Sequence, residues 1–112
     1  MDKLLKYREL VVDFMKDKVR QDMEGLPPFE TTYVTDTVND RYLYMHYGWS
    51  GREYNYGIYI HIDIIGEKIW LQRNYTEDEV VDKFIEAGVP HEDIVLGFVA
   101  PYMREATPFA KG

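Results

Sequence analysis

The chain has 112 residues, of which 46% are hydrophobic and 15% aromatic, so it can bury one core and belongs to the globular class of proteins. It contains no cysteine, which excludes disulfides and thiolate chemistry and is typical of an intracellular protein. Thirteen basic and twenty acidic residues give a net charge of −7, which argues against tight DNA binding by this chain alone because such binding needs surplus Lys and Arg.

No segment has the continuous apolar length of a signal peptide or a membrane span, and we therefore expect a cytoplasmic protein. Its length predicts a single domain over residues 1–112. The charge is unevenly distributed. Residues 75–112 contain eight acidic and three basic residues, a net of −5, whereas residues 1–24 contain six of each. We expect the acidic residues of this C-terminal segment to form either a surface that binds a basic partner or an ordinary surface that keeps the protein soluble.

The first 24 residues predict an amphipathic helix of about five turns. Its apolar residues recur at three- and four-residue spacing, and charged residues take the other positions. Asp2 is the expected N-cap, and Gly25 is expected to end the helix in a left-handed conformation before Pro27. The apolar positions are Leu4, Tyr7, Val11, Phe14, Met15 and Val19.

Residues 29–73 predict four consecutive strands in an antiparallel meander, because they are rich in β-branched and aromatic residues with period-two alternation. Turn signals separate the strands at residues 39–40, 50–51 and 66–67. The last turn predicts the register Ile65 with Lys68, Ile64 with Ile69, Asp63 with Trp70, Ile62 with Leu71, and His61 with Gln72.

This register gives the two faces of the sheet different characters. One face is aliphatic and is expected to lie under the helices; it carries Ile58, Ile60, Ile62, Ile64, Ile69 and Leu71. The other face is aromatic and polar at once; it carries Tyr59, His61, Asp63, Trp70 and Gln72.

A second, shorter helix is predicted after the sheet, since Thr76 and Glu79 have the capping-box spacing and an apolar stripe follows as far as Gly88. Residues 94–98 are expected to form a buried extended segment or a short helix. The expected fold is therefore α+β, with an N-terminal helix, a four-stranded antiparallel β-meander, a second helix and a C-terminal extension.

His61 and Asp63 form the sharpest candidate site, because residues two apart in a strand share a face and a carboxylate can raise the basicity of an imidazole. A general base or part of a metal site would need further groups, which Tyr44 and His46 could supply from an adjacent strand. A hydrogen-bonded or interface role for the pair is the favoured alternative. We accordingly predict no catalytic residue, no metal and no cofactor.

Seven of the ten tyrosines fall in the predicted strands, and an aromatic sheet can stack unpaired bases. Such platforms are flanked by Lys and Arg, however, and residues 29–74 contain four basic residues against six acidic ones. Tyrosine is equally typical of protein interfaces, and the charge balance favours that interpretation.

Distinctive blocks occur at residues 48–52 (Gly-Trp-Ser-Gly-Arg), 60–64 (Ile-His-Ile-Asp-Ile) and 68–74 (Lys-Ile-Trp-Leu-Gln-Arg-Asn), and again at residues 88–90 and 92–98. In order and spacing, these blocks resemble the XisI family of FdxN-element excision controlling factors. The resemblance spans the whole chain.

The resemblance implies an XisI-like fold and a cyanobacterial protein that controls excision of the FdxN element, a site-specific DNA rearrangement during heterocyst differentiation. It also implies association with an XisH-like, nuclease-type partner. The family supplies no established catalytic residues. After Phe98 the family pattern leads us to expect His-Pro-Pro, but Val99, Ala100 and Pro101 stand there, which weakens any catalytic role for this segment.

The predicted function is that of a non-enzymatic accessory factor acting through an XisH-like partner. The alternative is a small hydrolase or ligand-binding enzyme built around His61, Asp63 and Tyr59. The aromatic and polar face, with Trp70 as its anchor, further predicts a homodimer or higher oligomer, unless residues 94–109 fold over it and leave a monomer.

Overall fold

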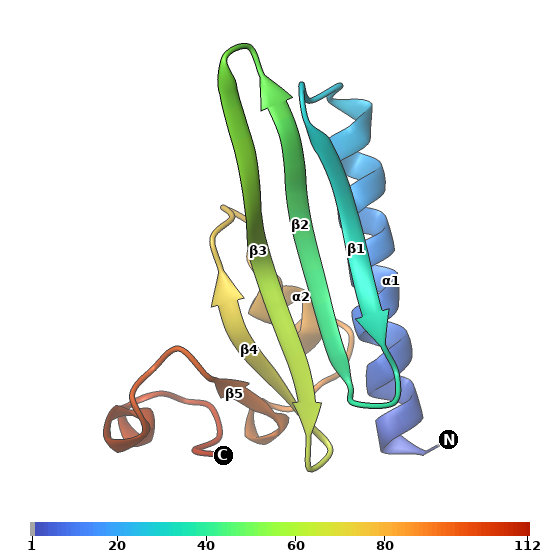
Figure 1. Cartoon of the computed structure of the whole chain (residues 1–112). Helices are drawn as coiled ribbons and strands as arrows, with labels where there is room; N and C mark the ends of the chain where they lie inside the picture. Colours follow the sequence, from blue (N-terminus) through green and yellow to red (C-terminus); the bar gives the residue numbers. More distant parts are fainter. Residues whose placement is uncertain (1) are drawn as a thin grey trace.

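The computed structural model describes residues 2–112, which form one mixed sheet with two helices packed against it (Figure 1). The predicted α+β class is confirmed, with a fifth short strand added to the four expected. The elements in chain order are α1 (Lys3–Glu24), β1 (Glu30–Asp36), β2 (Arg41–Ser50), β3 (Glu53–Ile65), β4 (Lys68–Asn74), α2 (Val80–Glu86), the 3₁₀ turn η1 (His91–Asp93), β5 (Ile94–Leu96) and the 3₁₀ turn η2 (Pro101–Ala106).

Helix α1 follows the apolar spacing of its sequence, and its N-cap is the expected one. The Asp2 carboxylate accepts a hydrogen bond from the Leu4 backbone N–H at 3.0 Å. The expected left-handed cap at Gly25 is wrong, because Gly25 has φ −78° and Leu26 takes the positive value of 50°. Leu26 directly precedes Pro27, whose ring disfavours the right-handed helical conformation in the residue before it.

Strands β1 to β4 form the predicted antiparallel meander, and β5 joins its far edge in the parallel direction beside β4. The turn between β3 and β4 consists of Gly66 and Glu67, with φ values of 58° and 60°. Two successive left-handed residues match the twist of a tight hairpin. Residues 94–96 are thus the extended alternative of the two expected, and α2 and η1 supply the crossover that a parallel neighbour needs.

Helix α2 begins at Val80 without the expected capping box. Glu79 occupies the N-cap position, and its side chain makes no capping bond. The Thr76 hydroxyl instead donates to the Asn74 side chain at 2.6 Å and accepts from the Asp78 backbone N–H at 3.2 Å. Thr76 therefore closes a turn between β4 and α2.

The register of β3 with β4 follows the prediction at first and then departs from it. Residues 62–65 pair with residues 68–71 as expected. His61 lies opposite Arg73, however, and not opposite Gln72. Gln72 is the extra residue of a β-bulge, which an alternating sequence pattern does not reveal.

A second bulge lies between β2 and β3. Tyr44 pairs with Ile60 and Met45 pairs with Ile58, which leaves Tyr59 as the extra residue. Because side chains alternate along a strand, one extra residue reverses the faces on one side of it. The expectation that Ile58 lies on the core face is therefore wrong: it shares the opposite face with Met45, while Tyr59 packs against the core.

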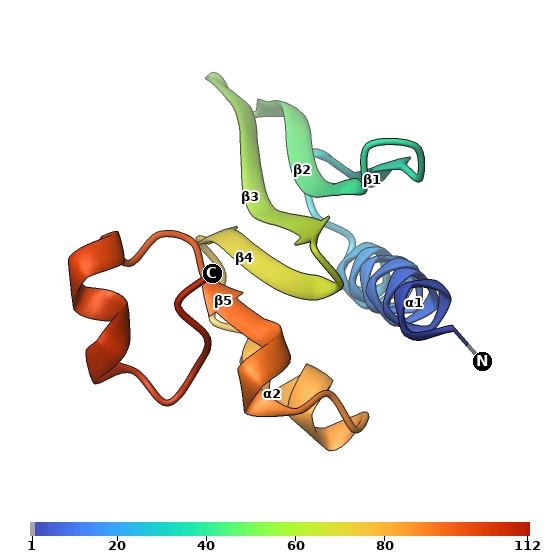
Figure 2. The ribbon, with the colours of Figure 1, turned by 90° about the horizontal axis from the view of Figure 1, so that it is seen from below.

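The core lies between the sheet and the two helices, which cover the same face (Figure 2). Phe14 of α1 and Phe84 of α2 meet there with ring centres 5.5 Å apart. The other five predicted aliphatic positions of β3 and β4 are all buried; they are Ile60, Ile62, Ile64, Ile69 and Leu71.

The C-terminal segment folds back on the other face of β4. The Arg104 guanidinium lies 5.1 Å from the centre of the Trp70 ring and donates to the backbone oxygens of Val99 (3.0 Å) and Gly97 (3.3 Å). The Lys68 ammonium donates to the last carbonyl of the chain at 2.6 Å. The expected cover by residues 94–109 therefore exists, and its contacts lie on the β4 part of that face.

Candidate functional site

Three of the predicted interface residues form one hydrogen-bonded cluster on the face away from α1. His61 Nε2 lies 2.8 Å from Asp63 Oδ1, and Gln72 Nε2 donates to Asp63 Oδ2 at 3.2 Å. Both carboxylate oxygens thus have partners, and the side chain of Asp63 is largely buried. The predicted proximity of His61 and Asp63 is confirmed, and the cluster has the geometry of a mutually satisfied polar group.

Tyr59 does not join this cluster. The bulge turns its ring to the helix side of the sheet, where it lies 4.4 Å from the His46 ring, measured between centres. Tyr44 and His46 also lie on that side, bonded to each other at 2.7 Å. The expectation that these residues could complete a site with His61 is therefore wrong, because the sheet itself separates them.

The helix-side residues form a polar network that the sequence analysis missed. The Tyr44 hydroxyl donates to the Asp22 carboxylate of α1, and Lys18 contacts the same carboxylate at 3.2 Å and Asp78 at 2.7 Å. Burial lowers the pKa of His46, so its imidazole is neutral at pH 7. This network ties α1 to β2 and to the segment before α2, which makes its role structural.

Trp70 is partly covered within the chain by Arg104 and by the C-terminal residue. The uncovered surface of this face lies farther along β2 and β3, toward the turn at residues 51–52. We call it the aromatic stripe. It consists of three cross-strand pairs, Met45 with Ile58, Tyr47 with Tyr56 and Trp49 with Tyr54, together with Leu43 and Val34 beside them.

The stripe is exposed and uncharged. Exposed fractions are 42% for Tyr47, 62% for Trp49, 54% for Tyr54 and 68% for Tyr56. The rings of Trp49 and Tyr54 meet edge to face with centres 5.1 Å apart. The sequence signal for the stripe was the alternation of aromatic residues on each side of the Ser50-Gly51 turn.

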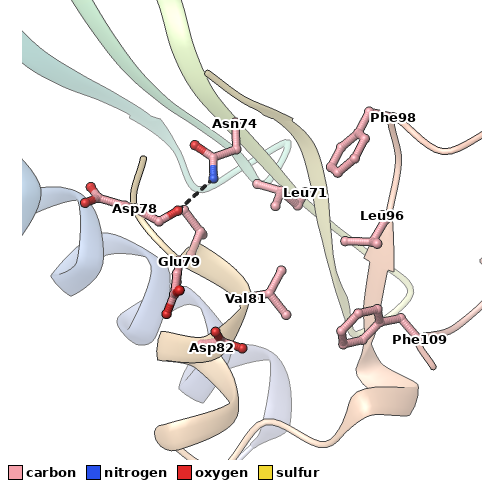
Figure 3. A pocket seen from close by; sticks show the side chains of 10 residues that line it. Leu71, Asn74, Asp78, Glu79, Val81, Asp82, Leu96, Phe98 and Phe109 are labelled. Atoms are coloured by element: carbon pink, nitrogen blue, oxygen red, sulfur yellow. Dashed lines mark hydrogen bonds between the residues drawn. The ribbon is translucent and has the colours of Figure 1, made fainter. Parts of the chain in front are cut away.

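A second surface feature is an open pocket of about 390 Å³ between β4, β5 and α2 (Figure 3). Its apolar lining comes from Leu71, Val80, Val81, Leu96, Phe98 and Phe109.

Three acidic residues, Asp78, Glu79 and Asp82, line the α2 side of this pocket, and we call it the acidic pocket. Asp78 is paired with Lys18, whereas Glu79 and Asp82 have no basic group within 4.0 Å among residues 2–112. The pocket therefore offers an apolar floor beside uncompensated negative charge, which suits an apolar side chain that is flanked by Lys or Arg.

Within residues 2–112, no three His, Asp or Glu side chains are grouped as metal ligands. Four pockets on this part of the chain are not lined by Tyr59, His61 or Asp63. None of the described helices combines the length and the apolar character needed to cross a bilayer.

Comparison with known proteins supports the resemblance seen in the sequence. The XisI protein family model matches residues 1–111. The crystal structure of a XisI-like protein from Anabaena variabilis is similar with a TM-score of 0.88 at 38% identity, over 96% of this chain and 97% of that one. The crystal structure of the fdxN element excision controlling factor XisI from the same organism has a TM-score of 0.81 at 33% identity, over 99% and 100% of the two chains. No curated protein matches the chain. The chain therefore belongs to the XisI family.

Proposed function

We propose that this chain is a cytoplasmic, non-catalytic accessory factor that helps to control excision of an FdxN-type DNA element by binding an XisH-like, nuclease-type protein. Family membership supports the excision role, since a relative that is 33% identical over the full length carries the description of fdxN element excision controlling factor. The partner is a further step, and it rests on the surface chemistry of this chain.

The observation that carries the partner assignment is the acidic pocket. A nuclease approaches a polyanion and therefore presents Lys and Arg on its working surface. Glu79 and Asp82 are free to pair with such groups, while the apolar floor beside them takes a flanking hydrophobic side chain. Contact at this pocket would place negative charge where the nuclease would otherwise hold phosphate, and would thus restrain it.

The enzymatic alternative has less support. It needs Tyr59 beside His61 and Asp63, and the bulge in β3 places Tyr59 on the opposite face. His61 and Asp63 are hydrogen-bonded to each other, but neither lines any of the four pockets described above. A non-catalytic role agrees with this arrangement.

Co-expression with the XisH-like protein of the same genome tests the proposal. We expect a complex that survives size-exclusion chromatography at micromolar concentration. Replacing Glu79 and Asp82 by Lys should weaken the complex at least about tenfold, because like charges then face each other. The matched control reverses Glu9 and Asp13, two exposed residues of α1, and should leave binding unchanged. Separate elution of the two wild-type proteins would refute the partner assignment.

A further inference from the structure

We propose that a second copy of this chain covers the aromatic stripe, so that the protein is a twofold dimer joined through β2 and β3. This inference is independent of the proposed function, because it concerns the opposite face of the sheet from the acidic pocket. It moves the predicted self-association from the region of Trp70 to the region of Trp49.

The stripe is large enough to need a cover. Side chains of Phe, Tyr and Trp present about 150–250 Å² each. At the exposed fractions of Tyr47, Trp49, Tyr54 and Tyr56, the four rings alone leave about 500 Å² of surface in water. Val34 is 46% exposed and adds to this patch. A typical stable interface takes about 800 Å² from each partner, which the stripe and its rim can supply.

The chain itself leaves this region open. Strand β4 pairs with β3 only from Ile60 to Ile65, and the C-terminal segment contacts Trp70 of β4. On its β3 side the β2–β3 hairpin therefore extends past the end of β4, while β1 flanks it on the β2 side (Figure 1). Any cover of the stripe has to come from another molecule.

Charge identifies a second copy as the occupant. The protein carries a net charge of −7, so two copies repel each other wherever carboxylates meet. The side chains of the stripe are all uncharged, which makes it a surface through which two like-charged chains can approach closely. A basic partner would find a counter-charge at the rim, where Glu30 lies opposite Tyr47, but none among the side chains of the stripe itself. A single-stranded nucleic acid would need Lys and Arg along it to neutralise the phosphates.

The stripe is also complementary to itself. Its aromatic residues lie toward the hairpin turn, and its aliphatic residues Leu43, Met45 and Ile58 lie toward the centre of the sheet. A twofold axis through the stripe runs the two hairpins in opposite directions and sets the rings of one copy on the aliphatic side chains of the other. An isologous contact needs only one such patch.

Light scattering coupled to size-exclusion chromatography, from 1 to about 100 µM protein, tests the inference. We expect twice the chain mass of 13.3 kDa for the wild type. The variant Trp49→Thr with Tyr56→Thr keeps residues that favour strands and should weaken the dimer at least about 30-fold, as loss of a central aromatic anchor does. If the double variant does not fold, the single variant Tyr56→Thr is used instead, and it should also weaken the dimer.

Tyr75→Thr is the matched control, because Tyr75 is 67% exposed but lies outside the stripe. It should leave the dimer intact. A monomeric wild type at about 100 µM would overturn the inference, as would a dimer that withstands loss of Trp49 and Tyr56 while both variants remain folded. Equal weakening by Tyr75→Thr would also overturn it, because the contact would then not be specific to the stripe.

Discussion

The hydrogen bond between Tyr7 and Asp93 joins α1 to η1, and its removal gives a quantitative test of the fold. Tyr7 lies on α1 and is 2% exposed, while Asp93 lies in η1 and is 6% exposed. The Tyr7 hydroxyl donates to Asp93 Oδ2, and the Lys3 ammonium contacts the same oxygen at 3.1 Å. These contacts attach the start of α1 to the segment that leads into β5.

We expect Tyr7→Phe to lower the free energy of unfolding by about 1.5–3 kcal/mol. A hydrogen bond to a charged group contributes about this much, and its loss leaves a buried carboxylate with one partner fewer. Lys3 can compensate only weakly, since its side chain is half exposed and surface ion pairs contribute little. Urea unfolding at pH 7 and at one fixed protein concentration gives the value, with Tyr75→Phe as an exposed control expected within about 0.5 kcal/mol of wild type.

The same contact predicts the pH dependence of this difference. Burial acts to raise the pKa of Asp93, but hydrogen bonds from Tyr7 and Lys3 and the charge of Lys3 outweigh burial and lower this pKa below its ordinary value of 3.8. A carboxyl group whose pKa is lowered by folding stabilises the folded state at pH values above its ordinary pKa. This stabilisation is lost as the pH falls through the lowered pKa. The difference in the free energy of unfolding between wild type and Tyr7→Phe should therefore be largest above about pH 5 and should decrease at lower pH.

Two results would refute this account of the contact. One is a Tyr7→Phe protein within about 0.5 kcal/mol of wild type at pH 7. The other is a difference that stays constant from pH 7 to pH 3. The double variant of Tyr7→Phe with Asp93→Asn provides a further check. Because the two residues are in contact, its loss of unfolding free energy should be smaller than the sum of the losses in the two single variants.

Three further variants test local geometry. Gly97→Ala should cost about 1–3 kcal/mol in urea unfolding, because the added methyl group would lie 2.9 Å from Gln72 Cδ; Gln72→Ala in the same chain should recover part of the loss. Replacing Gly66 by Asn and Glu67 by Gly should raise the unfolding free energy by about 0.5–1 kcal/mol, since Glu67 has φ 60° and Asn-Gly is the favoured pair of this turn. Trp70→Ala should lower stability by about 2 kcal/mol yet leave the oligomeric state seen in light scattering unchanged, because Trp70 packs within its own chain.

The sequence predicts the elements of this fold well because their signals are local. The helical spacing from Leu4 to Val19, the turn at residues 66–67 and the aliphatic alternation of β3 each depend on neighbouring residues. Strand β5 has a weaker local signal. Its three residues are apolar in either conformation, and only the ladder with β4 makes residues 94–96 a strand.

The candidate site was harder to predict because two single-residue bulges change which side chains share a face. The extra residue of the first bulge, Tyr59, precedes both His61 and Asp63, and that of the second, Gln72, lies on β4. Alternation along β3 is therefore uninterrupted from His61 to Asp63, and their proximity followed from it. Tyr59 is itself an extra residue and was assigned to the wrong face. The alternation on each side of Ser50-Gly51 predicts an aromatic surface, but its exposure depends on where β4 stops, which is a tertiary property.

The two proposed surfaces lie on opposite faces of the sheet, which leads to a last prediction about their independence. The aromatic stripe faces away from α1, whereas the acidic pocket lies beside α2, on the side that the helices cover. One dimer could therefore hold a partner at each of its two pockets.

The monomeric variant that lacks Trp49 and Tyr56 should consequently bind the XisH-like protein as one chain to one, with an affinity per site close to that of the wild type. The variant with Lys at residues 79 and 82 should remain dimeric and lose the partner. Light scattering of each variant alone and with the partner measures both properties in one series. If loss of the dimer also abolished partner binding at concentrations well above the wild-type dissociation constant, the two surfaces would be coupled, and the partner would have to contact both copies.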